Sequence, residues 1–214
     1  MRLYPQEPAA GPWTVKPLAE VAATLVGAGW SGRPALVAID GRSSSGKTTL
    51  AASICAAVDG AVVVHTDDIA WRHSVFGWDE LLASGVLLPA RRGESVAYRP
   101  PAWDIHGRPD AIELPATSLL LIVEGVGAGR RELVAYLDAI IWVQSDLDQT
   151  LARDRERVAA GEINADAYAD WMAQERPFQA GQETWARAQL IVCGSTSPER
   201  PHNHVMVAAP LRSA

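Results

Sequence analysis

The sequence predicts a three-layer α/β fold, in which a parallel sheet of about five strands lies between helices on both faces. Five short apolar runs indicate buried strands, because a strand covered on both faces is continuously apolar: 35–39, 61–64, 118–123, 139–143 and 189–192. Stretches with helical spacing of apolar residues separate the runs, and parallel strands need such crossover connections. Together these observations favour one open α/β sheet.

The length of 214 residues predicts a single domain over residues 1–214. Residues 1–16 are rich in Pro, Ala and Gly without any period, so we expect an N-terminal arm that is either loose or docked. A helix is expected over residues 17–30. Residues 71–115 break the strand–helix pattern with Gly, Pro and Trp, which predicts an insertion over the sheet edge. Residues 146–180 predict a helical lid region.

The composition excludes several classes of function. A net charge of −6 provides no positive field for a nucleic-acid backbone, so no nucleic-acid partner is expected. Cys55 and Cys193 are far apart and form no metal-binding pattern, which suits a reducing compartment. The sequence shows neither a secretory signal nor an apolar run of bilayer length. We therefore expect a cytoplasmic monomer or homodimer with no membrane partner.

A phosphate-binding loop follows the first apolar run. Residues 41–48 match the pattern G-x-x-x-x-G-K-S/T, with a strand before them and a helix after them. Glycines let successive N–H groups point at phosphate oxygens, Lys47 reaches the β- and γ-phosphates, and the Thr48 hydroxyl is a Mg²⁺ ligand. The alternative is an ordinary Gly/Ser turn. The residues expected to bind ATP and Mg²⁺ are Gly41, Ser43, Ser44, Ser45, Gly46, Lys47, Thr48 and Thr49.

The other motifs narrow the kind of phosphate-loop protein. A guanine-specific GTPase needs an Asn-Lys-x-Asp element, but Lys16 and Lys47 are the only lysines. The transporter pattern Leu-Ser-Gly-Gly-Gln is missing from the sequence as well. A small P-loop kinase with the three-layer NTPase sandwich is the remaining class.

Three carboxylates are expected at the edge of the sheet where parallel strands end. Asp67 and Asp68 follow the second apolar run, and Glu124 ends the third. A kinase that phosphorylates a hydroxyl can use such a carboxylate as a base, and we prefer Asp67, which could also ligate Mg²⁺. Glu124 is expected to contact Mg²⁺ through water, or the acceptor. The plainer interpretation is an Asx turn or a helix cap for the aspartate pair, and a helix-capping or solvated side chain for Glu124.

Three segments in this order and spacing carry a resemblance to a known family: residues 39–49, 65–68 and 123–125. They resemble the uridine kinase-like branch of P-loop kinases, which includes phosphoribulokinase and pantothenate kinase, and the similarity covers roughly residues 34–194. The resemblance implies ATP- and Mg²⁺-dependent phosphoryl transfer with Asp67 as the catalytic base.

The resemblance also implies roles for residues of the insertion. The Glu-Gly element of the family falls on Glu124, and its Tyr-Asp substrate element resembles Trp103-Asp104, with Trp in place of Tyr. The aromatic residue that usually follows the base is displaced to Trp71. The loop after the last core strand, beginning at Gly194, is expected near adenine.

Two arginines of the lid region share one helical face, Arg153 and Arg157. In this class of kinase, lid arginines offset charge on the transferred phosphoryl group, and Arg153 matches the family position best. We expect Arg153 to be catalytic and Arg157 to contact the nucleotide. The alternative is a solvated helix whose arginines pair with neighbouring acids.

The acceptor site is expected among residues of the insertion. Asp68, Arg99, Trp103 and Asp104 are the candidates, together with Glu124. Aromatic rings beside polar groups suit a ring-bearing acceptor such as a nucleoside, although aromatics could equally fill a local core. Arginines at 91, 92 and 99 could instead recognise an anionic acceptor.

The leading hypothesis is therefore a kinase that transfers the γ-phosphoryl group of ATP to a hydroxyl of a small molecule. A nucleotide-binding regulatory ATPase that signals to a protein partner is the alternative from another class. A monophosphate kinase is the third, and only the arginines of the insertion support it.

Overall fold

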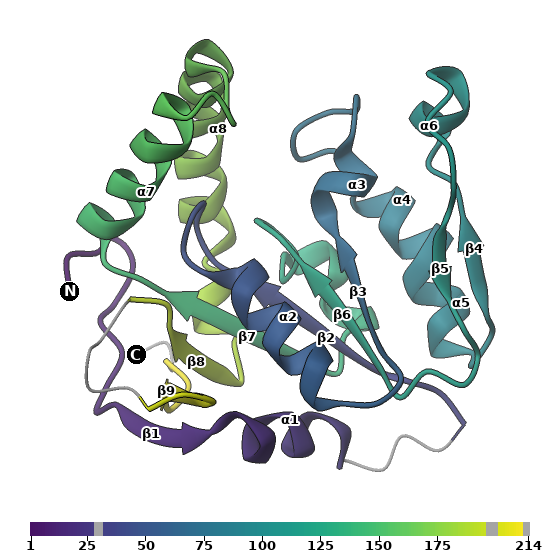
Figure 1. The fold of residues 1–214 in the computed structure, drawn as a ribbon, viewed down its shortest axis with the longest axis horizontal. Coiled ribbons are helices and arrows are strands. Elements are labelled where there is room, and N and C mark those ends of the chain that lie inside the picture. Colours follow the sequence, from purple (N-terminus) through teal and green to yellow (C-terminus); the bar gives the residue numbers. More distant parts are fainter. Residues whose placement is uncertain (28–31, 196–200, 212–214) are drawn as a thin grey trace.

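The main sheet is mixed, and five neighbouring strands of it are parallel (Figure 1). The structure is a computed structural model that describes residues 1–27, 32–195 and 201–211. Within these residues the sheet order is β1 (Thr14–Pro17), β9 (His204–Ala208), β8 (Leu190–Cys193), β7 (Ala139–Gln144), β2 (Ala35–Asp40), β6 (Leu120–Glu124) and β3 (Ala61–His65). All five predicted strands are present, and β1 and β9 extend them as an antiparallel edge.

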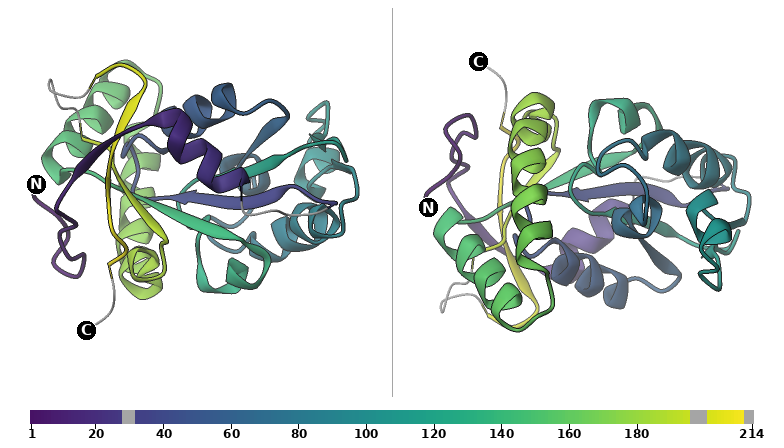
Figure 2. Two further views of the ribbon diagram at one scale, coloured as in Figure 1. Left: turned by 90° about the horizontal axis from the view of Figure 1, so that it is seen from below. Right: turned by 90° about the horizontal axis from the view of Figure 1, so that it is seen from above.

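Helices cover both faces of this sheet (Figure 2), which confirms the predicted three-layer class. One face packs on α1 (Leu18–Val26) and α2 (Lys47–Ala57). The helix expected over 17–30 thus begins one residue later, and residues 28–30 lie outside the described ranges. The other face packs on short helices: α3 (Thr66–Ala70), α4 (Asp79–Leu82), the π-helical turn η1 (Ala83–Leu87), α5 (Leu88–Arg91), and the 3-10 turns η2 (Arg131–Tyr136) and η3 (Thr184–Ala186).

The insertion over 71–115 builds much of this second layer. After α5 it forms a separate antiparallel pair, β4 (Val96–Tyr98) and β5 (Ile112–Leu114), joined through α6 (Pro101–Ile105). Trp78 and Trp103 are buried in the core on this face, with exposures of 1% and 4%. The plainer interpretation of these two aromatics, as core residues, is therefore the one that the structure supports.

Two long helices occupy the predicted lid region. α7 (Leu147–Ala159) is capped by Asp146, and α8 (Ala165–Gln182) is capped by Asn164; each side chain accepts two backbone N–H groups of the first turn. The pair rises beyond the strand ends on one side of the loop between β2 and α2, while the segment from α3 to α6 rises on the other (Figure 1). None of the helices in the described ranges has the length and hydropathy of a bilayer-spanning segment.

The N-terminal arm is docked, which is one of the two arrangements that the sequence left open. Glu7 is buried, forms an ion pair with Arg42 of the phosphate loop, and accepts hydrogen bonds from Trp142 Nε1 (2.8 Å) and Gln144 Nε2 (3.0 Å). β1 then pairs with β9. An edge strand and a single buried ion pair leave no periodic pattern in the sequence, which is why composition alone left both arrangements open.

We predict that Glu7→Ala lowers the free energy of unfolding by about 3–5 kcal/mol, because it leaves the Arg42 guanidinium buried without its counter-ion. Urea unfolding measures this loss. The control is Glu20→Ala, which breaks the exposed Lys16–Glu20 pair and should cost less than about 1 kcal/mol. Equal losses in the two variants would contradict the structural role of the arm.

Candidate active site

A cavity of about 1480 Å³ opens at the carboxyl ends of the parallel strands. Its lining comes from the loop between β2 and α2, the ends of β3 and β6, the two lid helices, and the segment that leads into β9. Ligands of open α/β sheets bind at this edge, where crossovers diverge. The cavity therefore gathers the loop and the strand-end carboxylates that the sequence placed apart.

The phosphate loop has the tight backbone that its motif predicts. Gly46 has a φ of +98° as the N-cap of α2, a conformation that favours glycine. Gly194, at the exit of β8, lies so close that a Cβ there would come within 1.9 Å of the Ser45 carbonyl oxygen. Glycine at 194 is thus required by close approach to the loop, and Gly194 also lines the cavity.

Buried Asp40 holds the start of the loop. Its carboxylate accepts the backbone N–H groups of Gly41 (2.7 Å), Gly127 (2.9 Å) and Gly129 (3.1 Å). Burial raises the pKa of Asp40, while these N–H groups and the charge of Lys47 oppose the shift. The carboxylate therefore joins the end of β2 to the segment that follows Glu124.

The loop donors fit a triphosphate. Lys47 is buried, and its Nζ donates to the Arg42 carbonyl at 2.8 Å, a neutral partner that a phosphate oxygen could replace. The Ser43 N–H donates to the carboxylate of Glu175 at 2.8 Å, so one loop N–H already binds an anionic oxygen. The Ser44 hydroxyl donates to Asp154.

Glu175 and Asp154 were missed from the sequence. Both lie on lid helices among charged residues that resemble a solvated surface, but both are buried. Glu175 also accepts from Trp171 Nε1 and Gln179 Nε2, and burial raises its pKa. The sequence predicted a helical lid region, but nothing local showed which side chains face the loop.

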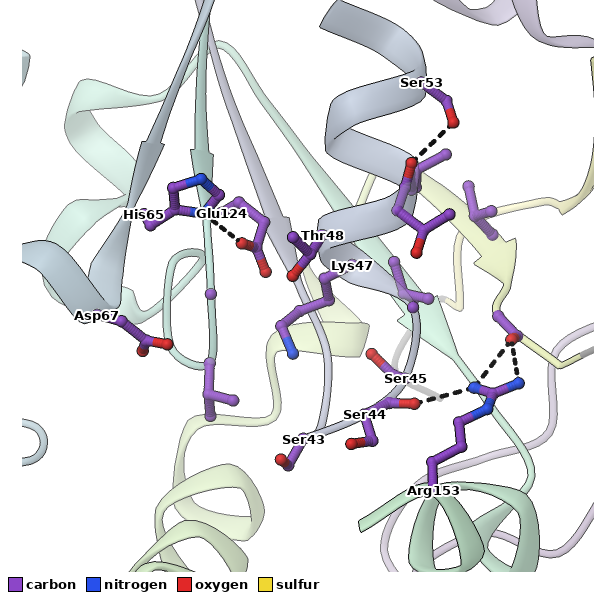
Figure 3. A pocket seen from close by; sticks show the side chains of 18 of the residues that line it. Ser43, Ser44, Ser45, Lys47, Thr48, Ser53, His65, Asp67, Glu124 and Arg153 are labelled. Carbon is purple, nitrogen blue, oxygen red and sulfur yellow. Dashed lines mark hydrogen bonds and ion pairs between the residues drawn. The ribbon is translucent and has the colours of Figure 1, made fainter. Parts of the chain in front are cut away.

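Asp67 and Glu124 face the loop across the cavity (Figure 3). Asp67 lies in the first turn of α3 and opens into the cavity, where desolvation by surrounding protein atoms raises the pKa of its carboxyl group. The positive charge of Lys47 opposes this shift. Glu124 is almost fully buried at the end of β6.

His65 is a further cavity residue that the sequence did not single out. Its Nδ1 lies 2.8 Å from Glu124 Oε2, and this hydrogen bond is the main reason that the pKa of His65 is raised. His65 has no metal-ligand spacing in the sequence, so we expected a structural or solvated histidine. Register explains the pairing, since His65 and Glu124 are partners in the β3–β6 ladder.

The oxygens of Thr48, Asp67 and Glu124 are the kind of ligand that Mg²⁺ takes. All three residues line the cavity, and Figure 3 shows Thr48 beside Lys47 and Glu124, with Asp67 farther across the cavity. In the described part of the chain, no group of three or more His, Cys, Asp or Glu residues could hold a metal ion. A Mg²⁺ ion here would therefore complete its shell with nucleotide oxygens and water, as is usual for this ion.

Only one of the acceptor candidates on or beside the insertion lines the cavity. Asp68 does so, and its Oδ1 pairs with Arg108 Nη2 at 2.5 Å. Because Asp67 and Asp68 lie in a helical turn, helical geometry and this ion pair separate their side chains, where alternation along an extended segment was expected.

Arg99, Trp103 and Asp104, which were expected at the substrate site, are not among the cavity residues. Arg99 Nε pairs with Asp104 at 2.7 Å, and the other guanidinium nitrogens of Arg99 donate to backbone carbonyls. The Trp103 ring is buried, and the Arg108 guanidinium carbon lies 3.8 Å from the centroid of this ring. These residues stabilise the insertion itself. The resemblance to a Tyr-Asp substrate element and the aromatic rings beside polar groups had suggested contact with the acceptor.

The remaining arginines of the insertion are also committed elsewhere. Arg91 donates to the Tyr136 carbonyl and lies near Asp138, and Arg92 pairs with Glu94. Neither lines the cavity. The arginines that supported an anionic acceptor, and with it a monophosphate kinase, thus have structural partners.

The two lid arginines differ in their surroundings. Arg153 Nη1 donates to the Ser44 carbonyl at 2.9 Å, and both Nη atoms lie 3.5 Å from the Gly194 carbonyl (Figure 3). Arg157 lines the outer part of the cavity, but it is exposed and pairs with Glu162 at 3.3 Å. Arg153 therefore contacts the phosphate loop. Arg157 instead forms an exposed ion pair, as expected from the alternative interpretation of a solvated helix whose arginines pair with neighbouring acids.

No family model matches the sequence, and no curated protein matches it either. Solved structures match over most of the chain. A candidate fructose transport system kinase from Silicibacter sp. TM1040 is 20% identical, with a TM-score of 0.58 over 86% of this chain and 100% of its own. D-glycerate 3-kinase from Cryptococcus neoformans var. grubii is 12% identical, with a TM-score of 0.50 over 83% of this chain and 93% of its own. At these identities the likeness shows the fold alone, and it confirms the predicted P-loop kinase fold.

We predict that Lys47→Ala weakens ATP binding at least about tenfold, because a charge-assisted contact to the phosphates is lost while the fold is kept. Calorimetric titration with ATP measures the change. The matched control is Lys16→Ala, which removes the other lysine from an exposed pair and should leave the affinity unchanged. ATP affinity equal to that of the unaltered protein in Lys47→Ala would contradict the loop assignment.

Proposed function

We propose that the protein is an ATP- and Mg²⁺-dependent kinase that transfers the γ-phosphoryl group to a hydroxyl of a small molecule such as a nucleoside. The observation that carries this proposal is the position of Asp67, a carboxylate that opens into the same cavity as the phosphate loop and Lys47. A regulatory ATPase has no need of a base at this position, so the kinase is favoured. Such a reaction requires neither nucleic acid nor membrane.

Asp67 would orient the acceptor hydroxyl in line with the γ-phosphorus and accept its proton during transfer. The raised pKa of Asp67 suits this role, because a more basic carboxylate binds the proton more strongly than an ordinary one. Glu124, held by His65, would fix the position of the acceptor or of a water molecule at the metal. Bound Mg²⁺ would supply charge neutralisation on the phosphates, with Thr48 as its protein ligand.

The phosphate side of the site would be formed by the loop and the lid. Lys47 would exchange the Arg42 carbonyl for phosphate oxygens, and the Ser43 N–H would exchange Glu175 for a second anionic oxygen. Arg153 would place its charge beside the transferred group, which develops negative charge in the transition state. Each of these donors would exchange its present hydrogen-bond partner for a phosphate oxygen, and the new hydrogen bond would be of similar or greater strength.

We predict that Asp67→Asn reduces phosphoryl transfer by about 10²–10⁴, because it keeps the shape of the side chain and removes the base. Single-turnover transfer from ATP to the acceptor found by screening measures the rate, and calorimetry should show that ATP still binds. Asp68→Asn is the comparison variant and should reduce transfer much less, since Asp68 pairs with Arg108. Transfer at the unaltered rate in Asp67→Asn would remove the base assignment; loss in Asp68→Asn alone would move it to the neighbouring residue.

We further predict that Arg153→Ala lowers kcat by about 10²–10³ and raises the KM for ATP much less, because its charge acts chiefly on the transition state. Steady-state kinetics with varied ATP separates the two constants. Arg157→Ala is the matched control on the same helix and should stay within about threefold of the unaltered enzyme, as expected for an exposed pair. A kcat unchanged by Arg153→Ala would leave this arginine with a structural role in the loop.

A further inference from the structure

The wall of the cavity opposite the phosphate loop is acidic. We call this surface the acceptor wall and define it as His65, Asp67, Asp68 and Glu124, all of which line the cavity. Three of the four are carboxylates. Lys47 and Arg153, which also line the cavity, contact the loop and belong to its phosphate side.

The cations nearest the acceptor wall already have partners. His65 is bound to Glu124, so any charge it carries offsets a carboxylate of the wall. Arg108 is paired with Asp68 and stacked on the Trp103 ring. Arg130 is buried behind the wall, where it donates to the Phe76 carbonyl and to Asp79 and lies 4.1 Å from the centroid of the Trp78 ring.

The hydrogen-bonding character of the wall follows from these contacts. Of the two carboxylate oxygens of Asp68, Oδ1 accepts a hydrogen bond from Arg108, and Oδ2 has no hydrogen-bond partner among the described residues. Oδ2 is therefore able to accept a hydrogen bond from a ligand. Asp67 opens into the cavity with its carboxylate facing the loop (Figure 3). The wall therefore offers oxygen acceptors and negative charge, and it complements a ligand that brings hydroxyl or ammonium donors.

We propose that the phosphoryl acceptor is a polyhydroxyl molecule without negative charge, and that an amino group on it increases its turnover. This inference rests on the proposed kinase function and specifies its substrate class. A carboxylate or phosphomonoester on the acceptor would approach three carboxylates and the triphosphate. The cations named above already pair with carboxylates of the protein, so none of them is free to bind such an anionic group. Like charges brought together in a cavity cost several kcal/mol, whereas an ammonium group would find Asp68 Oδ2 within the wall.

The first experiment uses the full-length protein with γ-labelled ATP, Mg²⁺ and four pools of acceptors. The pools are uncharged polyols and nucleosides, amino sugars and aminocyclitols, sugar acids including glycerate, and sugar or nucleoside monophosphates. We expect labelled product from the first two pools, with kcat/KM at least about 100-fold above that of any anionic acceptor on the same carbon skeleton. Faster transfer to a carboxylate or phosphomonoester would overturn the charge assignment and leave the kinase proposal standing. Absence of product from every pool, with ATP still bound, would overturn both.

The second experiment tests the wall itself with two variants of opposite effect. Arg108→Gln removes the counter-ion of Asp68 and should raise the ratio of kcat/KM for an amino sugar to that for the matching uncharged sugar about threefold to fivefold. Asp68→Asn removes the carboxylate and leaves Arg108 without it, so the same ratio should fall by a similar factor. Thermal melting checks that both variants are folded. Ratios that are unchanged, or that move in one direction in both variants, would overturn the role of the acidic wall.

Discussion

Asp40 accepts three backbone N–H groups from two segments, the start of the phosphate loop and the turn after Glu124. The geometry of the site depends on this buried carboxylate, because it joins the ends of neighbouring strands β2 and β6 at the edge where the cavity opens. Burial raises its pKa, and the N–H groups with the charge of Lys47 stabilise the ionised form. The distance between the phosphate loop and Glu124 is thus set by backbone contacts to one side chain.

The lid helices bind the same loop through charged side chains. Glu175 accepts the Ser43 N–H, Asp154 accepts the Ser44 hydroxyl, and Arg153 donates to the Ser44 carbonyl. The loop is therefore held open in a defined shape by an anionic oxygen where a phosphate oxygen is expected. Binding of a nucleotide would replace one anion by another at Ser43, so the loop needs little rearrangement of its own donors.

The insertion and the N-terminal arm support this site from outside it. Arg108 is held over the Trp103 ring and from there orients Asp68, so core residues of the insertion determine the charge presented by the acceptor wall. On the other side, Glu7 of the arm binds Arg42, whose carbonyl oxygen accepts the Lys47 Nζ. Each of the two segments thus contacts a residue next to one that is expected to act.

The sequence by itself determined the sheet, the loop and the two carboxylates that face it. Continuous apolar runs predict buried strands, a glycine-rich motif between strand and helix predicts the loop, and parallel strand ends gather at one edge, so Asp67 and Glu124 were expected together. Tertiary structure alone decided that the arm is docked, that Glu175 reaches the loop, that His65 pairs with Glu124, and that Arg99, Trp103 and Asp104 lie away from the cavity. The reason is physical: the Ser43–Glu175 bond joins residues 132 positions apart and the Glu7–Gln144 bond joins residues 137 apart. Local periodicity carries no information about which distant polar groups meet, because that depends on how the helices and the arm pack against the finished sheet.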